Sequence, residues 1–122
     1  MQDSQYSISS KFTSAYRLLR ADGFDRVIRA ENVTDKHFKI FFTRNCKNNA
    51  RLGVIASKKL LPNAVDRNRV KRFIRETFRK HTIKLCRLDL VVKVSSGHSW
   101  KVDSRIDNLK KLFSQIENRC AE

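Results

Sequence analysis

The chain is short and strongly basic. Its 122 residues include 27 Lys and Arg against 12 Asp and Glu, which leaves a formal net charge of +15, and 40% of them are hydrophobic. This length excludes a two-domain architecture, and the eight Phe residues argue for a folded core rather than a disordered basic tail. A charge this large implies a polyanionic partner, of which nucleic acid is the commonest and an anionic membrane is the alternative.

Residues 1–13 are polar, and we expect them to form a flexible lead-in to a single domain over residues 14–122. The start of the chain lacks the basic and apolar stretches of a secretory signal, and no apolar run approaches the ~20 residues of a membrane-spanning helix. The three cysteines are odd in number and form no Cys-x-x-Cys pair, which indicates isolated thiols in a reducing compartment. These features predict a soluble, cytoplasmic protein.

A short helix and a strand are predicted first along the chain. Residues 20–29 place apolar side chains at the i, i+3, i+4 spacing of one helical face, although Gly23 in the first turn weakens a helix. Residues 37–43 alternate between apolar and other positions, which predicts a strand with one strictly apolar face. Lys39 and Phe41 lie on the other face of that strand.

Two more strands and two more helices complete the predicted fold. Residues 51–57 follow a polar loop of hairpin length, and we expect them to pair antiparallel with the preceding strand. Asn63 is a good N-cap for a long helix that ends near His81. Residues 89–94 form a third strand, and Asp103 begins a last helix with an apolar face. This order predicts an α+β sandwich with helices packed on a single sheet.

Nearly half of the net charge lies in the long predicted helix and the strand end before it. Nine basic and two acidic residues between positions 58 and 80 leave a net charge of +7. At about 100° per residue, the apolar residues of the helix gather on one face and the basic residues on the adjacent face. The series from Arg67 to Arg79 in steps of four repels itself, whereas solvated helices usually mix charges. The pattern predicts a phosphate ligand. Most of the basic residues are Arg, which favours RNA or DNA as the source of that phosphate. A membrane is disfavoured because the core needs the apolar face of the helix.

Residues 51–79 also resemble a known family. Their sequence, RLGVIASKKLLPNAVDRNRVKRFIRETFR, is similar to the signature of the bacterial ribonuclease P protein subunit. In that family a strand of the type R-(I/L)-G-(I/V/L)-x-(V/A)-(S/A)-K-K leads into R-N-R-x-K-R-x-x-R-E-x-F-R. The segments 17–19 and 23–28 are similar to the first strand and helix of the family, so the resemblance covers roughly residues 17–118.

The resemblance implies an αβββαβα fold in which the stretch at Arg17 counts as the first short strand. It also implies a left-handed β-α-β crossover that contains the basic helix, although such crossovers are almost always right-handed. Cleavage would belong to a large catalytic RNA, which removes the 5′ leader from precursor tRNA using Mg²⁺, so the holoenzyme would be an endoribonuclease. The protein alone would bind no cofactor, and its partners would be the catalytic RNA and the leader, with no membrane and no protein partner.

Two binding surfaces, and no catalytic or metal-ligating side chain, follow from the resemblance. The positions that match contacts to the catalytic RNA are Lys58, Lys59, Arg67, Asn68, Arg69, Lys71, Arg72, Arg75 and Arg79. A cleft between the first helix and the exposed sheet face would hold the single-stranded leader, and its matching positions are Phe24, Ile28, Lys39 and Phe41. Aromatic faces and scattered cations suit such binding. Ile28 stands where an aromatic residue is common, so apolar contact replaces stacking there, and the alternative role for Phe24 is packing beneath the helix.

Two other functions compete with this interpretation. An autonomous ribonuclease would use two of the three histidines, His37, His81 and His98, as general acid and base. Their scatter over a strand, a helix end and a loop provides no catalytic spacing, which disfavours this alternative. A structural ribosomal protein would share the charge but not the motif from Arg67 to Arg79.

Overall fold

The computed structural model of the chain describes residues 14–19, 23–95 and 102–120. The predicted lead-in over residues 1–13 lies outside this part of the chain, as do His98 and the side chain of Asp103. The elements in chain order, with η for a 3₁₀ helix, are η1 (Ser14–Tyr16), α2 (Phe24–Ile28), β1 (Glu31–Thr34), β2 (Phe38–Arg44), β3 (Arg51–Ile55), α3 (Ala64–Arg79), η3 (Thr82–Leu85), β4 (Leu88–Val94) and α4 (Val102–Cys120).

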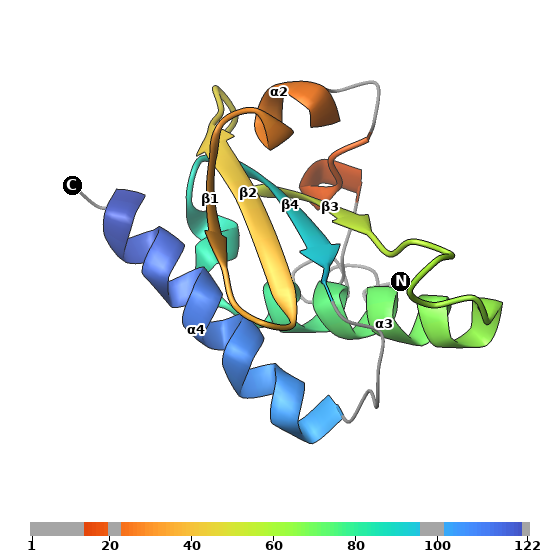
Figure 1. The fold of residues 1–122 in the computed structure, drawn as a ribbon. Coiled ribbons are helices and arrows are strands. Elements are labelled where there is room, and N and C mark those ends of the chain that lie inside the picture. The colour runs from red at the N-terminus through yellow and green to blue at the C-terminus, as the bar shows by residue number, and fades with distance from the viewer. Residues whose placement is uncertain (1–13, 20–22, 96–101, 121–122) are drawn as a thin grey trace, which may run out of the picture.

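The strands form one mixed sheet in the order β1-β2-β4-β3. The β1–β2 and β2–β4 pairs are antiparallel, whereas β3 and β4 are parallel. Helices α3 and α4 cover one face of the sheet and the short α2 lies on the other (Figure 1). The α+β class is therefore confirmed, and the crossover from β3 through α3 to β4 is left-handed.

The predicted hairpin between β2 and β3 is wrong, because β4 lies between these two strands. The loop that joins them pairs its backbone with the segment before β4: Asn45 N–H donates to the Arg87 carbonyl at 3.0 Å, and Ala50 N–H donates to the Lys84 carbonyl at 3.1 Å. The chain thus crosses the end of β4 and enters the sheet on its far side. Alternation in the sequence identifies the buried face of a strand but not its neighbours.

The predicted first strand at Arg17 is reduced to a single bridge. Arg17 pairs with Leu52 of β3 in parallel fashion, and Leu18 N–H donates to the Leu52 carbonyl at 3.0 Å. The strand that completes the αβββαβα order is instead β1, which follows α2. Val33 is its one buried residue, so this edge strand carries no apolar alternation from which it could be predicted.

Two apolar clusters lie on opposite faces of the sheet. The larger fills the space between the sheet and helices α3 and α4, and takes Phe38, Ile40 and Phe42 from β2, as predicted. The smaller lies beneath α2 and consists of Leu18, Phe24, Val27, Phe41 and Val91. Because α2 has five residues, it covers only part of the outer face of the sheet.

Helix α3 forms where the sequence predicts it. The Asn63 side chain caps its start by accepting a hydrogen bond from Val65 N–H at 2.8 Å. The residues buried along the helix are those of the predicted apolar face: Val70, Phe73, Ile74, Thr77 and Phe78. Since the core occupies this face, the basic side chains of α3 are left on the outside.

Candidate nucleic-acid interface

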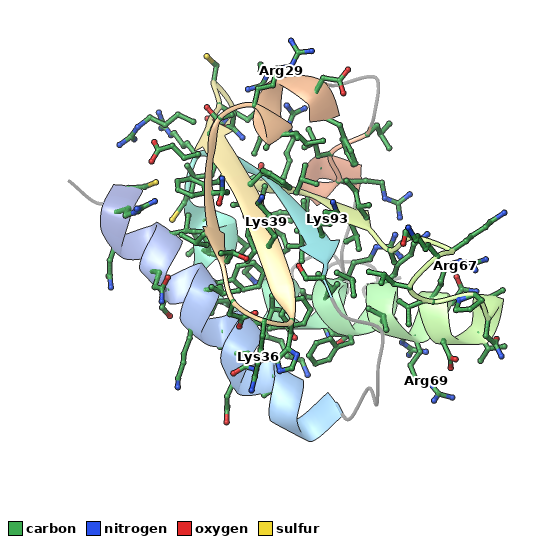
Figure 2. The ribbon with its side chains drawn as sticks, in the orientation of Figure 1. Arg29, Lys36, Lys39, Arg67, Arg69 and Lys93 are labelled. Atoms are coloured by element: carbon green, nitrogen blue, oxygen red, sulfur yellow. The ribbon has the colours of Figure 1, made fainter. Side chains whose placement is uncertain are left out.

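The outer side of α3 gathers the positions predicted to contact phosphate. Asn68, Arg69 and Arg72 are exposed along the helix, and Lys58 and Lys59 are exposed in the turn after β3. The remaining predicted positions, which are half-buried, are Arg67, Lys71, Arg75 and Arg79. Arg67 and Arg69 are labelled on the N-terminal half of the helix in Figure 2.

Arg67 fastens the start of α3 to the turn before it. Its Nη1 donates to the Leu61 carbonyl at 2.9 Å and to the Pro62 carbonyl at 3.0 Å. Both bonds use the same nitrogen, so the guanidinium is held against the turn through Nη1. A fixed planar fork is well suited to a phosphate, because little side-chain entropy remains to be lost on binding.

Arg79, at the other end of the series, has an acidic partner. Its Nη2 donates to Glu76, and Lys80 Nζ lies 3.9 Å from the same carboxylate oxygen. The hydrogen bond from Arg79 lowers the pKa of Glu76 below its ordinary value, which keeps this carboxylate ionised. The repulsion along the basic series is therefore relieved at its C-terminal end, and Arg79 is less available to an anion than Arg69 or Arg72.

A further arginine, Arg17, which no charge pattern in the sequence marks as a binding residue, approaches α3 from the N-terminal segment. Burial, followed by the positive charge of Arg17, lowers the pKa of the Arg75 guanidinium. Arg17 therefore lies close enough to Arg75 to add to the positive potential of this surface. The sequence does not indicate this role for Arg17, because the residue belongs to no charge pattern and its neighbours are predicted to form a strand.

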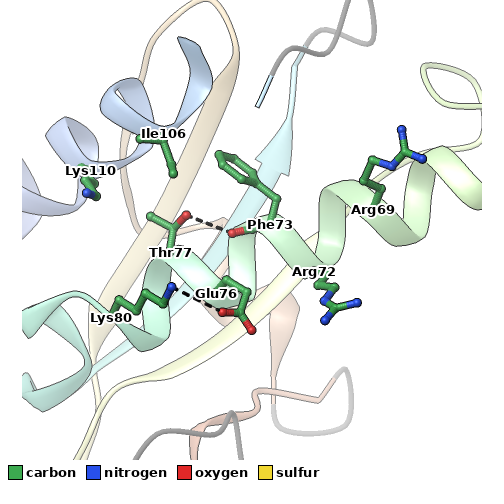
Figure 3. Close-up of a pocket in the computed structure, with 8 residues that line it drawn as sticks. All are labelled: Arg69, Arg72, Phe73, Glu76, Thr77, Lys80, Ile106 and Lys110. Atoms are coloured by element: carbon green, nitrogen blue, oxygen red, sulfur yellow. Dashed lines mark hydrogen bonds and ion pairs between the residues drawn. The ribbon is translucent and has the colours of Figure 1, made fainter. Parts of the chain in front are cut away.

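A groove of about 460 Å³ separates α3 from α4 (Figure 3). Phe73, Thr77 and Ile106 form its apolar floor, and the Thr77 hydroxyl donates to the Phe73 carbonyl at 2.9 Å. Basic side chains lie around it, from Arg69, Arg72 and Lys80 on the α3 side and Lys110 on α4. The basic surface thus extends onto α4 through Lys110. The sequence pattern of this helix indicates its core positions but not which of its basic residues faces α3.

A second cationic site lies on the outer face of the sheet. Thr34, Lys39, Lys93 and Ile55 form one row across all four strands. Lys39 and Lys93 are direct cross-strand partners, Lys93 is exposed, and Lys39 Nζ lies 5.2 Å from the centre of the Phe41 ring. Both lysines are labelled over the sheet in Figure 2. Lys93 was missed, although its position between the buried Val92 and Val94 places it on this face.

The next row of the sheet lies under α2 and contains Phe41, Val91 and Gly53. Phe24 packs its ring on Gly53 so closely that a Cβ at this glycine would lie 2.3 Å from the ring Cζ. The structure thus brings Phe24, Ile28, Lys39 and Phe41 together, as the cleft prediction requires. The expected open aromatic faces are absent at Phe24 and Phe41, however, since each residue is only 7% exposed.

Asp89 holds α2 and the adjoining loop onto this face. Its buried carboxylate accepts hydrogen bonds from Arg51 of β3, Arg26 of α2 and Asn45 of the β2–β3 loop. Burial alone raises the pKa of Asp89, but the hydrogen bonds from Arg51, Asn45 and Arg26 outweigh it and lower the pKa below the ordinary value. Helix α2 and the β2–β3 loop are therefore anchored to the sheet by an ionised group.

The histidines of the described chain do not assemble an acid–base pair. His81 caps η3, since its Nδ1 accepts from Ile83 N–H at 3.0 Å, and its Nε2 lies 3.2 Å from the Ser114 hydroxyl. His37 lies in the turn before β2. Cys46, Cys86 and Cys120 are free thiols. No group of three or more His, Cys, Asp or Glu that could hold a metal ion occurs among the described residues.

Within the same described part of the chain, no helix has both the length and the apolar character needed to cross a membrane.

Comparisons with known proteins agree with this architecture. The family model for ribonuclease P matches residues 12–117. The chain is 32% identical over 117 residues to the ribonuclease P protein component of Thioalkalivibrio sulfidiphilus, covering 94% of this chain and 98% of the relative. It is 39% identical over 107 residues to that of Legionella pneumophila (strain Lens), covering 86% of this chain and 92% of the relative.

Two solved structures share the fold. The RNase P protein from Staphylococcus aureus, at 28% identity, superposes with a TM-score of 0.74 over 83% of this chain and 94% of that one. The RNase P protein from Thermotoga maritima, at 22% identity, has a TM-score of 0.71 over 81% of this chain and 96% of that one.

Proposed function

The chain belongs to the ribonuclease P protein family, and from this premise we propose that it assists a catalytic RNA in removing the 5′ leader from precursor tRNA. Its family makes it the RNA-binding protein component of a tRNA-processing ribonucleoprotein. In this proposal the RNA subunit cleaves the phosphodiester with its own Mg²⁺ ions, and the protein binds and positions the two RNAs in the cytoplasm.

The observation that carries the proposal is the basic side of α3. Exposed Arg69 and Arg72, with Lys58 and Lys59 beside the start of the helix, form a cationic surface whose apolar reverse side is fully used by the core. Arg67 adds a guanidinium that is already fixed in position. Such a surface tracks the phosphates of a structured RNA and sets its register without reading bases. We assign it to the catalytic RNA, together with Arg17 and Lys110.

The cleft beside α2 is assigned to the single-stranded leader. It lies on the opposite face of the sheet from α3, so the two surfaces can bind two RNA segments at once. Its accessible cations are Lys39 and Lys93, and its apolar wall includes Ile28. A leader bound there adds contacts that mature tRNA lacks, which gives the holoenzyme a preference for its substrate over its product.

Reconstitution with the cognate RNA tests the proposal. The purified protein alone should leave precursor tRNA intact, and addition of the RNA should restore cleavage at the mature 5′ end, with tighter substrate binding than the RNA achieves alone. Cleavage at that position by the protein without RNA would show that the catalytic role has been assigned to the wrong subunit. Failure of the protein to change either affinity or rate would remove the proposed assisting role.

A further inference from the structure

The open part of the proposed leader cleft is cationic and offers no ring for a base. Stacking on an aromatic side chain requires an accessible ring face. Phe24 is packed on Gly53, and Phe41 lies beneath α2 with the Lys39 ammonium over its ring. Ile28 and Ile55 flank these rings and provide apolar contact without a π face. Among the described residues of this face, the exposed groups include Lys93, Asn32, Thr34 and the arginines within α2 and at its C-cap, and Lys39 is half-buried. None of the exposed side chains described on this face is aromatic.

The two lysines are placed where a single anion can contact both. They are directly opposite each other in register on β2 and β4, and the Cβ atoms of such partners lie about 5 Å apart. Two like charges in this arrangement destabilise a sheet. In the part of the chain that the structure describes, no carboxylate forms an ion pair with either lysine to relieve this cost. An anion supplied from outside would relieve it.

The surroundings favour a phosphodiester as this anion. The row is bordered by Thr34 on one edge and Ile55 on the other, so an extended chain can cross the sheet along it. Lysine is a flexible point charge that binds phosphate without demanding a bidentate geometry. A backbone phosphate also brings a sugar and a base, for which Ile28 and Ile55 offer apolar surface.

We propose that Lys39 and Lys93 together bind one backbone phosphate of the leader, so that this cleft recognises the leader by charge and position rather than by base stacking. The inference rests on the proposed function, because it takes the leader of precursor tRNA as the strand in the cleft. Lys93 then has a role in binding, and the Phe41 ring lies beneath Lys39 and supports it. Leader recognition is then tolerant of sequence, sensitive to salt and fixed in register at one phosphate.

Substrate chemistry and paired variants test this site in the reconstituted holoenzyme. Affinities for precursor tRNA and for mature tRNA are measured for the unaltered protein, Lys39→Gln, Lys93→Gln and the double variant. Lys47→Gln, an exposed lysine in the loop at the other end of β2, is the matched control. The substrates carry one neutral methylphosphonate at each leader position in turn, or one abasic nucleotide.

The double variant should bind precursor tRNA about tenfold more weakly at low salt, as expected for loss of a charge-assisted contact. Binding of mature tRNA should not change, and the slope of log affinity against log salt should fall by about 0.7, the value for one phosphate of a single strand. With the unaltered protein, a methylphosphonate at one leader position should weaken binding of precursor tRNA by a similar factor. With the double variant, the same methylphosphonate should not weaken binding any further. Abasic nucleotides should cost less than twofold.

Each unexpected result would contradict a different part of the proposal. If the unaltered holoenzyme binds precursor and mature tRNA equally, the leader cleft itself is wrong. If the leader contributes affinity but the double variant matches Lys47→Gln, the cleft stands and the two-lysine site is wrong. A flat methylphosphonate scan, or a tenfold loss with an abasic leader, would replace phosphate recognition by base recognition.

Discussion

Arg51 on β3 and Asp89 on β4 form a two-point ion pair within the sheet: Arg51 Nε donates to Oδ1 at 2.9 Å and Nη2 donates to Oδ2 at 2.8 Å. Arg26 from α2 and Asn45 from the β2–β3 loop donate to the same carboxylate, whose side chain is fully buried. One acidic residue therefore joins the short helix, the loop and two strands. The position of α2 thus depends on this group as well as on the packing of Phe24 and Val27 against the sheet.

Asp89→Asn should lower the free energy of unfolding by about 3 kcal/mol, because it removes the counter-charge of Arg51 in a buried setting. Urea denaturation followed by circular dichroism measures this change. Asp25→Asn, on the exposed side of α2, is the matched control and should alter the free energy by less than about 0.5 kcal/mol. Equal effects of the two substitutions would show that Asp89 does not anchor the helix.

The same carboxylate should make stability depend on pH on the acid side. The pKa of Asp89 is lowered in the folded protein, so the stability that it provides is fully present above the unfolded pKa of about 3.9. That stability is lost as the pH falls from there through the folded pKa. Unfolding free energies measured between pH 6 and pH 2.5, roughly the span over which an Asp titrates, should fall more steeply for the unaltered protein than for Asp89→Asn. Burial also lowers the pKa of His81, but this contribution is common to both proteins and cancels in the comparison. Parallel curves would contradict the prediction.

Gly53→Ala should destabilise the protein by about 2 kcal/mol. The added methyl group would lie 2.3 Å from Phe24 Cζ and 3.2 Å from the Leu18 carbonyl oxygen, so the ring must move and lift α2 from the sheet. The double variant Gly53→Ala/Phe24→Leu should recover at least half of the loss, because the shorter side chain leaves room for the methyl. Denaturation of the two single variants and the double variant gives the coupling energy, and simple additivity would show that the ring and the glycine act independently.

The basic helix could be predicted in detail because its determinants are local. Asn63 supplies the cap within two residues of its partner, and the five buried positions of α3 follow from the helical period. The outward direction of Lys39 and Phe41 followed equally from the alternation of β2. In each case, neighbouring residues carry the whole signal.

What the sequence did not reveal depends on contacts between distant segments. The insertion of β4 between β2 and β3 rests on loop hydrogen bonds to Lys84 and Arg87, residues far along the chain. The closeness of Arg17 to Arg75 and the burial of Phe41 under α2 are likewise tertiary. Lys93 is different. Its alternation with two valines in the sequence indicates the outer face of the sheet, but its position opposite Lys39 depends on the register between β2 and β4.

Arg69→Gln/Arg72→Gln should weaken binding to the catalytic RNA and lower the slope of log affinity against log salt by nearly two units, at about 0.9 per phosphate contact in a duplex. Both side chains are exposed on α3, so the fold should be unaffected. Arg79→Gln is the control on the same helix, because its guanidinium is already paired with Glu76. Filter binding over a range of salt concentrations measures the slopes. A reduction in slope for Arg79→Gln equal to half that of the double variant would mean that the ion pair opens when RNA binds.

Phe41→Leu should separate the two roles that an aromatic residue can have in the cleft. Leucine retains most of the apolar volume beneath α2, so the free energy of unfolding should fall by only about 1 kcal/mol. The Phe41 residue is 7% exposed and Lys39 lies over its ring, so affinity for precursor tRNA should change by less than about threefold, within the ~0.5–1 kcal/mol of the lost cation–π contact. A loss of tenfold or more on precursor tRNA, with mature tRNA binding and stability retained, would show that α2 moves aside and that the ring stacks on a leader base.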